Sequence, residues 1–252
     1  MPKILNWDLE TGLQLVSLFD LEIRGGYISH KSLETERYII CASFKEMNKK
    51  AFSHDISEFS RFKDDPTDDY FLVKRIRQEL EDADVLVHHN GDRFDLRFLN
   101  ARLAIHGFDP IPPDIICVDT CKLAKKKFKF NSNSLEYLAK VLGVQPKPKI
   151  SGATWKKCME GDVAAVKKMA EYNIGDVETL EQIYSKLAPF DIAKFNTNLV
   201  SDKAVCSHCG SPWLEKRGFR YTKTRKYQRY QCNECHGWSQ SVKSEKDGAE
   251  LK

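Results

Sequence analysis

Two pairs of cysteines near the end of the chain place the strongest constraint on its fold. Cys206 and Cys209 form one C-x2-C pair, Cys232 and Cys235 form a second, and 22 residues separate the two. Two such pairs can direct four thiolates at one ion, and a single tetrahedral Zn²⁺ fits this spacing. An iron–sulfur cluster and a pair of disulfides are the alternatives. The motif therefore predicts a small structural zinc module over residues 204–240.

The rest of the chain has the length and composition of one folded domain. With 252 residues, the chain has room for about 200 residues beside the cysteine module. Hydrophobic residues make up 41% and charged residues 30%, which indicates a globular chain rather than a disordered one. There is no run of about 18 apolar residues and no signal peptide, so we expect a cytoplasmic protein with no membrane partner. Four further cysteines are expected to be free thiols in a reducing compartment: Cys41, Cys117, Cys121 and Cys158.

The net charge of +4 is unevenly distributed along the chain. Residues 200–252 contain 11 Lys and Arg against 6 Asp and Glu, a balance of +5, whereas the other 199 residues balance at −1. This asymmetry indicates a basic module attached to a near-neutral domain, and nucleic acid is the commonest partner of such a module. A tail that is charged only for solubility would have the same composition, so charge alone leaves both interpretations open.

Hydrophobic periodicity predicts an α/β fold. Apolar runs over residues 3–10 and 38–44, with an alternating stretch over 13–23 between them, predict three strands of an antiparallel meander. Short strands over 84–88 and 115–118 then alternate with helical patterns over 70–83 and 93–106. This order predicts a mixed sheet flanked by helices.

Capping residues and composition predict the remaining boundaries. Asn133 is expected to cap one helix, and Asp162 a long last helix that runs from Val163 to about Lys186. We therefore expect a domain over residues 1–190, a linker over 191–203, the zinc module over 204–240 and a disordered tail over 241–252.

A pair of acidic residues lies in the first predicted strand. Asp8 and Glu10 are two positions apart, so both side chains project from the same face. Neighbouring carboxylates repel each other, and they persist mainly where a cation binds between them or where water reaches them. Many surface strands carry such a pair, so it indicates a site only together with other residues.

Two further groups of polar residues follow. Asp92 and Asp95 lie between a short strand and a helix, where open α/β sheets bind ligands. Asp92 also fits an acid that interacts with the helix dipole, and position alone does not choose between the two. Tyr172 and Asp176 share one face of the last helix, but by themselves they favour a core tyrosine and a solvated aspartate over a site.

Taken together, these groups resemble the motifs of the DEDD (DnaQ-like) 3′–5′ exonuclease superfamily, which has an RNase H-like fold. The likeness covers about residues 3–188 and is closest to the proofreading domain of B-family DNA polymerases. The motifs D-x-E, N-x3-F-D and Y-x3-D match Asp8 and Glu10, Asn90 with Phe94 and Asp95, and Tyr172 with Asp176. The second match selects Asp95 over Asp92. A histidine at position 171 would mark the other subclass, but the chain has Glu171, so the tyrosine subclass is indicated.

The resemblance implies a hydrolase that releases nucleoside 5′-monophosphates from the 3′ end of DNA at single-stranded or frayed ends. Its catalytic residues would be Asp8, Glu10, Asp95, Tyr172 and Asp176. The four carboxylates would hold two Mg²⁺ or Mn²⁺ ions, because hard cations prefer oxygen ligands. Tyr172 would orient the attacking water, since a phenol of pKa about 10 is a poor base at pH 7. Contacts to the nucleic acid are expected from Thr11, Asn90 and Phe94.

The cysteine module resembles the zinc ribbons attached to transposases and transcription factors. Residues 206–235 hold seven bases and two acids with interleaved aromatics. Bases contact phosphates and aromatic rings can stack on unpaired nucleobases, whereas the alternative is a small aromatic core with a solvated charged face. Nucleic-acid contacts are expected from six residues: Arg217, Arg220, Lys223, Arg225, Lys226 and Arg229.

The leading hypothesis is a free-standing DNA exonuclease that uses its ribbon to hold nucleic acid, with a replication or repair protein as a further partner. The alternatives are a 3′–5′ exoribonuclease, an endonuclease on the same fold, and a non-enzymatic zinc-ribbon adaptor with an inactive nuclease fold. The adaptor is disfavoured because all four acids and Tyr172 are present.

Overall fold

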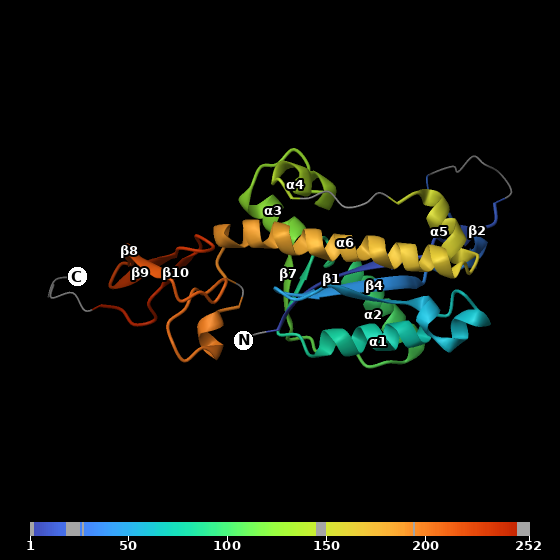
Figure 1. The fold of residues 1–252 in the computed structure, drawn as a ribbon, viewed down its shortest axis with the longest axis horizontal. Coiled ribbons are helices and arrows are strands. Elements are labelled where there is room, and N and C mark those ends of the chain that lie inside the picture. The colour runs from blue at the N-terminus through green and yellow to red at the C-terminus, as the bar shows by residue number, and fades with distance from the viewer. Residues whose placement is uncertain (1–2, 19–25, 27, 145–149, 194, 246–252) are drawn as a thin grey trace.

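A computed structural model describes residues 3–18, 26, 28–144, 150–193 and 195–245 (Figure 1). Within these ranges no helix has both the length and the apolar character needed to cross a membrane. The described cysteines are all free thiols, as expected for the four scattered ones.

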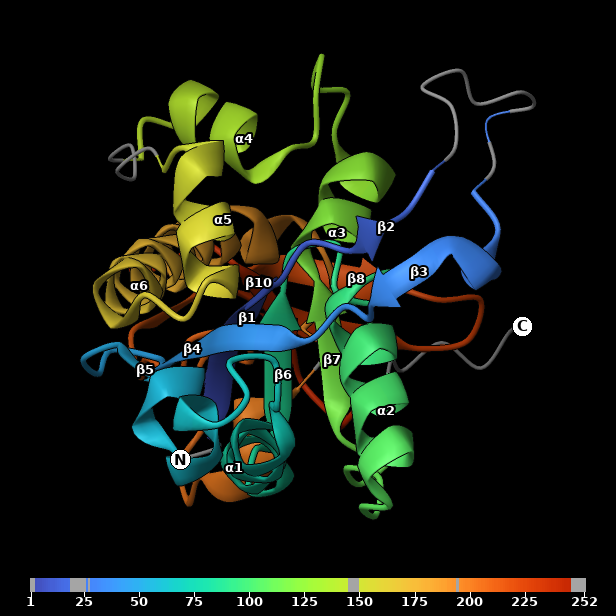
Figure 2. The same cartoon turned by 90° about the vertical axis from the view of Figure 1, so that its right-hand side faces the viewer.

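A five-stranded mixed sheet forms the centre of the larger domain (Figure 2). Its strand order is β5-β4-β1-β6-β7, in which β1 pairs antiparallel with β4 and parallel with β6. This arrangement confirms the predicted mixed, RNase H-like sheet. The strands are β1 (Ile4–Thr11), β4 (Ile39–Glu46), β5 (Phe52–Asp55), β6 (Val85–His88) and β7 (Ile116–Asp119).

Helices cover both faces of this sheet (Figure 1). The long helix α6 (Val163–Leu187) crosses one face and contacts β1, β4 and β5. Helices α1 (Tyr70–Glu81) and α2 (Asp95–His106) lie on the other face. Asp162 caps α6 as predicted, because its side chain accepts the N–H of Ala165. Three shorter helices complete the domain: α3 (Thr120–Lys127), α4 (Leu135–Val141) and α5 (Gly152–Met159).

The alternation of side chains along β1 orients its acidic residues. Leu5, Trp7 and Leu9 are buried in the main hydrophobic core. Because neighbouring residues of a strand point to opposite faces, Asp8 and Glu10 project from the face that α6 covers. The bulky Trp7 therefore belongs to the core and does not occupy the acidic face.

Several local predictions were wrong or incomplete. Within the stretch predicted as the second meander strand, only β2 (Leu15–Val16) is a strand, and it pairs with β3 (Leu33–Thr35) in a separate two-stranded sheet. Residues 19–23 of that stretch lie outside the described residues. The strand β5 and the helices α3 and α5 were not anticipated. Ser134, not Asn133, caps α4, because its hydroxyl accepts the N–H of Tyr137.

The C-terminal part forms a separate antiparallel sheet beyond the end of α6 (Figure 1). Its strands are β8 (Leu214–Tyr221), β9 (Lys226–Cys232) and β10 (Trp238–Gln240), in the order β10-β9-β8. We call residues 204–240 the ribbon. The chain continues along this sheet to Glu245, whose N–H donates to the carbonyl of Lys226.

Candidate active site

Three carboxylates converge between the central strand and the long helix. Asp8 and Glu10 of β1 and Asp176 of α6 each place a carboxylate oxygen within 4.8 Å of the others. Asp176 is only 3% exposed, although it belongs to a helix whose other buried residues are mostly apolar. Asp8 and Glu10 are partly exposed, and a cation bound among the three carboxylates would offset their mutual repulsion. The site therefore has the donor set of a divalent metal site.

Asn173 orients one of these carboxylates, and sequence reasoning missed it. Its Nδ2 donates to Asp8 Oδ2 over 2.6 Å, and its side chain is fully buried. Asn173 lies three residues before Asp176 on α6, so both project toward β1. This i, i+3 spacing was the signal available in the sequence. The hydrogen bond fixes the rotamer of Asp8 relative to Asp176.

Asp95 lies at the start of α2, against the same strand. Its carboxyl is 4% exposed, and burial raises its pKa from 3.8 to about 7, although hydrogen bonding to the backbone N–H groups of Asp95 and Leu9 lowers it in part. Leu9 lies between Asp8 and Glu10, so this carboxyl adjoins the three-carboxylate group without belonging to it. A cation next to Asp95 would stabilise its charged form.

Asp95→Asn is expected to raise the free energy of unfolding at pH 8 by a few kcal/mol in the absence of Mg²⁺ and Mn²⁺. Because the pKa of Asp95 is raised in the folded state, ionisation of this carboxyl opposes folding. The cost is absent below the unfolded-state pKa of about 4, grows as the pH rises, and is complete above about 7. The gain should therefore shrink between pH 8 and pH 5, as measured by urea unfolding. Asp92→Asn, at a partly exposed carboxylate paired with Lys122, is the control. An equal gain at both pH values would contradict burial of a charged Asp95.

Tyr172 lies one helical turn before Asp176 and is partly buried against the core. Its ring meets that of Trp155 edge to face, with the centroids 6.5 Å apart and the planes at 70°. Trp155 comes from α5, a helix that the sequence did not predict. This contact restricts the orientation of the Tyr172 ring, one helical turn before Asp176.

The three residues expected to contact nucleic acid lie around the carboxyl ends of β1 and β6. Thr11 ends β1 at an irregularity in its pairing with β4. Asn90 adopts a positive φ of 63°, and its N–H donates to Asp119, which also caps α3. Phe94 stacks on Phe98 with the centroids 5.9 Å apart. The structure thus places these three residues near the site, and their contacts with a substrate remain a prediction.

A second group of potential ligands, His88, Asp92 and Asp119, also lies within 4.8 Å. Nδ1 of His88 accepts the N–H of Gly91, and burial lowers the pKa of the ring, so the neutral ring carries its proton on Nε2. That nitrogen lies 3.2 Å from Asp92 Oδ1 without a hydrogen bond to it, and because it carries the proton it has no free lone pair with which to ligate a metal. Asp92 is therefore held in a structural group, apart from Asp8, Glu10 and Asp176.

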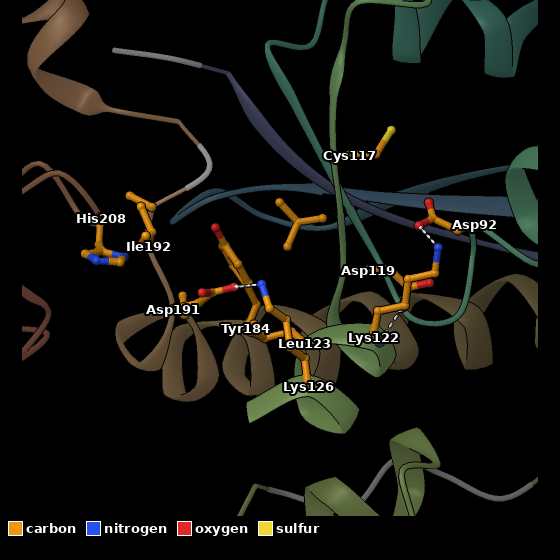
Figure 3. A pocket seen from close by; sticks show the side chains of 13 residues that line it. Asp92, Cys117, Asp119, Lys122, Leu123, Lys126, Tyr184, Asp191, Ile192 and His208 are labelled. Carbon is orange, nitrogen blue, oxygen red and sulfur yellow. Dashed lines mark hydrogen bonds and ion pairs between the residues drawn. The ribbon is translucent and has the colours of Figure 1, made fainter. Parts of the chain in front are cut away.

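A cavity of about 260 Å³ lies where the ribbon meets the larger domain (Figure 3). Its wall includes Lys122 and Lys126 from α3, Asp191 from the segment after α6, and His208 from the ribbon. An ion pair joins Lys126 to Asp191 across 3.5 Å. None of the three converging carboxylates lines this cavity, so it is distinct from the acidic site.

The four cysteines of the ribbon surround one point. The Sγ atoms of Cys206 and Cys235 are 3.5 Å apart and those of Cys209 and Cys232 are 3.7 Å apart. A tetrahedral site with Zn–S bonds of about 2.3 Å requires S···S distances of about 3.8 Å, whereas a disulfide requires about 2.05 Å. Backbone N–H groups of residues 208, 234 and 237 donate to three of the sulfurs. This geometry fits a zinc ribbon.

The four thiols differ in how readily they lose their protons when no metal is bound. A hydrogen bond from Cys235 lowers the pKa of Cys206 to about 4, and the same contact raises the pKa of Cys235. Without a cation, the four thiols at this separation cannot all lose their protons. A divalent ion at the centre would favour loss of the proton from all four thiols, since zinc ligates thiolates.

Comparisons with known proteins place this geometry in a family. A family model described as the RNase H superfamily matches residues 28–188. The chain belongs to the RNase H superfamily. This assignment confirms the likeness inferred from the motifs, and the group Asp8, Glu10 and Asp176 is consistent with the DEDD pattern. The matched range begins after β1, so the structure itself supplies the link between the first two acids and the family fold.

A solved structure gives an independent view of the RNase H-like fold. The chain is similar to the family B DNA polymerase from the hyperthermophilic archaeon Pyrobaculum calidifontis, with a TM-score of 0.55 and 16% identity. The match covers 90% of this chain and 32% of the polymerase chain, so the protein spans about a third of that polymerase. A search of curated proteins found no match. The RNase H-like fold and its acidic cluster support nuclease activity.

Proposed function

We propose that the protein is a metal-dependent 3′–5′ exonuclease that hydrolyses DNA to nucleoside 5′-monophosphates. The observation that carries this proposal is the convergence of Asp8, Glu10 and Asp176 beneath α6. Asp95 adjoins the same strand, and Tyr172 lies one turn from Asp176. This is the residue set that the DEDD resemblance requires, on the fold that it implies.

The donor set suits two Mg²⁺ or Mn²⁺ ions, because every side chain involved offers carboxylate oxygens. Asp8, Glu10 and Asp176 would hold one ion, and Asp8 with Asp95 would hold the second. When bound, such ions neutralise the carboxylates, acidify water and stabilise the charge on the attacking and leaving oxygens. Asn173, which donates to Asp8 Oδ2, would hold Asp8 in place as a ligand.

Tyr172 is proposed to position the attacking water. Its phenol is a hydrogen-bond donor and acceptor at neutral pH, and it lies on the same helix as Asp176. Contact with Trp155 limits the motion of the ring, which favours a fixed geometry for the water. The phenol thus acts by orientation and keeps its proton.

The direction of cleavage and the preference for DNA rest on the likeness to polymerase proofreading domains. The polymerase match supports them, since it pairs nearly all of this chain with a domain-sized part of a DNA polymerase. An exoribonuclease and an endonuclease would use the same carboxylates. A replication or repair protein is proposed as a further partner on the same grounds.

The proposal is tested with one oligonucleotide labelled at its 5′ end in one sample and at its 3′ end in another. With Mg²⁺, the 5′-labelled strand should give a ladder of single-nucleotide steps, while the 3′ label is released at once as a mononucleotide. Discrete internal cuts would instead show an endonuclease, and faster digestion of the matched RNA would show an exoribonuclease. Asp92→Ala, outside the acidic group, serves as a matched control for loss of a carboxylate.

A further inference from the structure

The ribbon sheet has two faces, and Cys232 projects from one of them. Cross-strand pairing in the antiparallel sheet places directly opposed residues on the same face. One face carries the metal-ligand candidate Cys232, which pairs with Leu214. The pairs Lys216 with Tyr230 and Phe219 with Gln228 lie on the same face. On the other face, Arg220 pairs with Tyr227, Arg229 with Gln240, and Trp238 with Gln231.

Two arginines and two aromatic rings thus share the face away from the cysteines. We call Arg220, Tyr227, Arg229 and Trp238 the Arg–Trp face. Trp238 is 46% exposed, and both arginines are exposed. The guanidinium of Arg229 lies over the indole of Trp238, with Cζ 5.2 Å from the ring centroid. The acid on this face, Glu215, is paired with Arg217 at 3.0 Å.

Among the described residues, the three clusters of buried apolar side chains include none from the ribbon. A large ring that stays half exposed on a module with so few buried apolar groups is not explained by packing of a small core. Exposed tryptophan beside arginine is instead typical of surfaces on which unpaired nucleobases stack. The charge of the C-terminal part, +5, matches a polyanion.

We propose that the Arg–Trp face binds an unpaired strand of DNA, with the arginines on its phosphates and the rings against its bases. A duplex offers phosphates but keeps its bases stacked and paired, so it would use the arginines and leave Trp238 without a partner. This inference rests on the proposed nuclease function and adds to it the form of DNA that the ribbon holds.

The position of the ribbon separates this face from the acidic site. Asp176 lies 11 residues before the end of α6, which corresponds to about 16 Å along the helix axis. The ribbon begins beyond that end (Figure 1). One strand must therefore extend several nucleotides past the cleaved bond to reach the Arg–Trp face, and a dinucleotide is too short to do so.

Binding is measured by fluorescence anisotropy in the Asp8→Ala/Glu10→Ala background, with a 5′-labelled 20-nucleotide single strand and its duplex. Trp238→Ala should weaken single-strand binding about tenfold and leave duplex binding within about twofold. Arg229→Ala should weaken both and reduce the slope of log K against log salt by about one. Lys216→Ala removes the same charge from the opposite face and should change single-strand affinity by less than threefold.

Folding and function have separate controls. Zinc content of one ion per chain shows that each variant retains its ribbon, and Trp238→Phe should restore most of the single-strand affinity. In otherwise wild-type enzyme, Trp238→Ala should raise KM for the 20-nucleotide strand about tenfold and leave cleavage of a dinucleotide unchanged. Unchanged single-strand affinity in Trp238→Ala, equal loss on duplex, or an equal effect of Lys216→Ala would overturn the proposal. A chain that binds single strands through this face and cleaves none would overturn the nuclease function alone.

Discussion

Replacing both Asp8 and Glu10 with alanine is expected to lower the rate of DNA hydrolysis by at least about 1000-fold. Strand β1 contributes two of the three carboxylates of the acidic group, Asp8 and Glu10, and helix α6 contributes the third, Asp176. Without them Asp176 is the only carboxylate of the three-residue group that remains, and a hard cation loses most of its oxygen ligands. Binding of Mn²⁺, measured by calorimetry, should be lost together with activity in a gel assay with Mg²⁺.

Tyr172→Phe provides the contrast for this prediction. The phenol is proposed to orient water and to ligate nothing, so its removal should slow cleavage on the order of 100-fold and leave Mn²⁺ affinity within about threefold. Glu171→Ala, at an exposed position on the same helix, should change neither property. Activity of the double alanine variant close to that of the wild type would contradict the assigned site. A loss of Mn²⁺ affinity in Tyr172→Phe as severe as in the double variant would contradict the role of the phenol.

The acidic group was predicted through the resemblance to the DEDD family, and local periodicity accounts for the positions of its residues only within each element. Alternation along one strand places Asp8 and Glu10 on the same face, and a helical repeat places Tyr172 on the side of Asp176. These relations hold whatever the tertiary structure. The spacing of the cysteines is equally local, since each C-x2-C pair forms its own turn.

Residues that depend on packing between distant elements were not predictable in this way. Trp155 meets Tyr172 only because α5 packs on α6, and α5 begins at Gly152, which has a low helix propensity. Asn173 meets Asp8 across 165 positions of sequence. The second predicted strand rested on alternation at Phe19, Leu21 and Ile23, which lie outside the described residues, and Leu13 and Leu15 of the same stretch are each 47% exposed.

The order of the strands in the sheet could not be predicted from the sequence either. The central strand β1 pairs with β4 and skips the intervening β2 and β3, which form a small sheet of their own. Nearest-neighbour pairing, the usual expectation for successive strands, therefore failed at this point. The parallel pairing of β1 with β6 brings the segments that carry Asp8 and Asp95 together, so this non-local pairing is what assembles the site.

Cys232→Ser is expected to release the metal and unfold the ribbon while the larger domain stays folded. Cys206 and Cys232 are fully buried, and among the described residues the ribbon contributes to none of the three apolar clusters. Its folding free energy must therefore come largely from the metal, for which zinc peptides give about 10–16 kcal/mol of apparent binding energy at pH 7. Elemental analysis should show one zinc per chain in the wild type and almost none in the variant.

The variant also separates the two parts of the molecule. Limited proteolysis should cut within residues 204–240 of Cys232→Ser and leave the larger domain intact, because that domain has its own hydrophobic core. Cleavage of a dinucleotide should persist within about threefold, whereas affinity for a long single strand should fall about tenfold or more as the Arg–Trp face is lost. Cys117→Ser, at an exposed thiol of the larger domain, is the matched control and should retain zinc and affinity. Zinc retained in Cys232→Ser, or iron found in the wild type, would contradict a four-cysteine zinc ribbon.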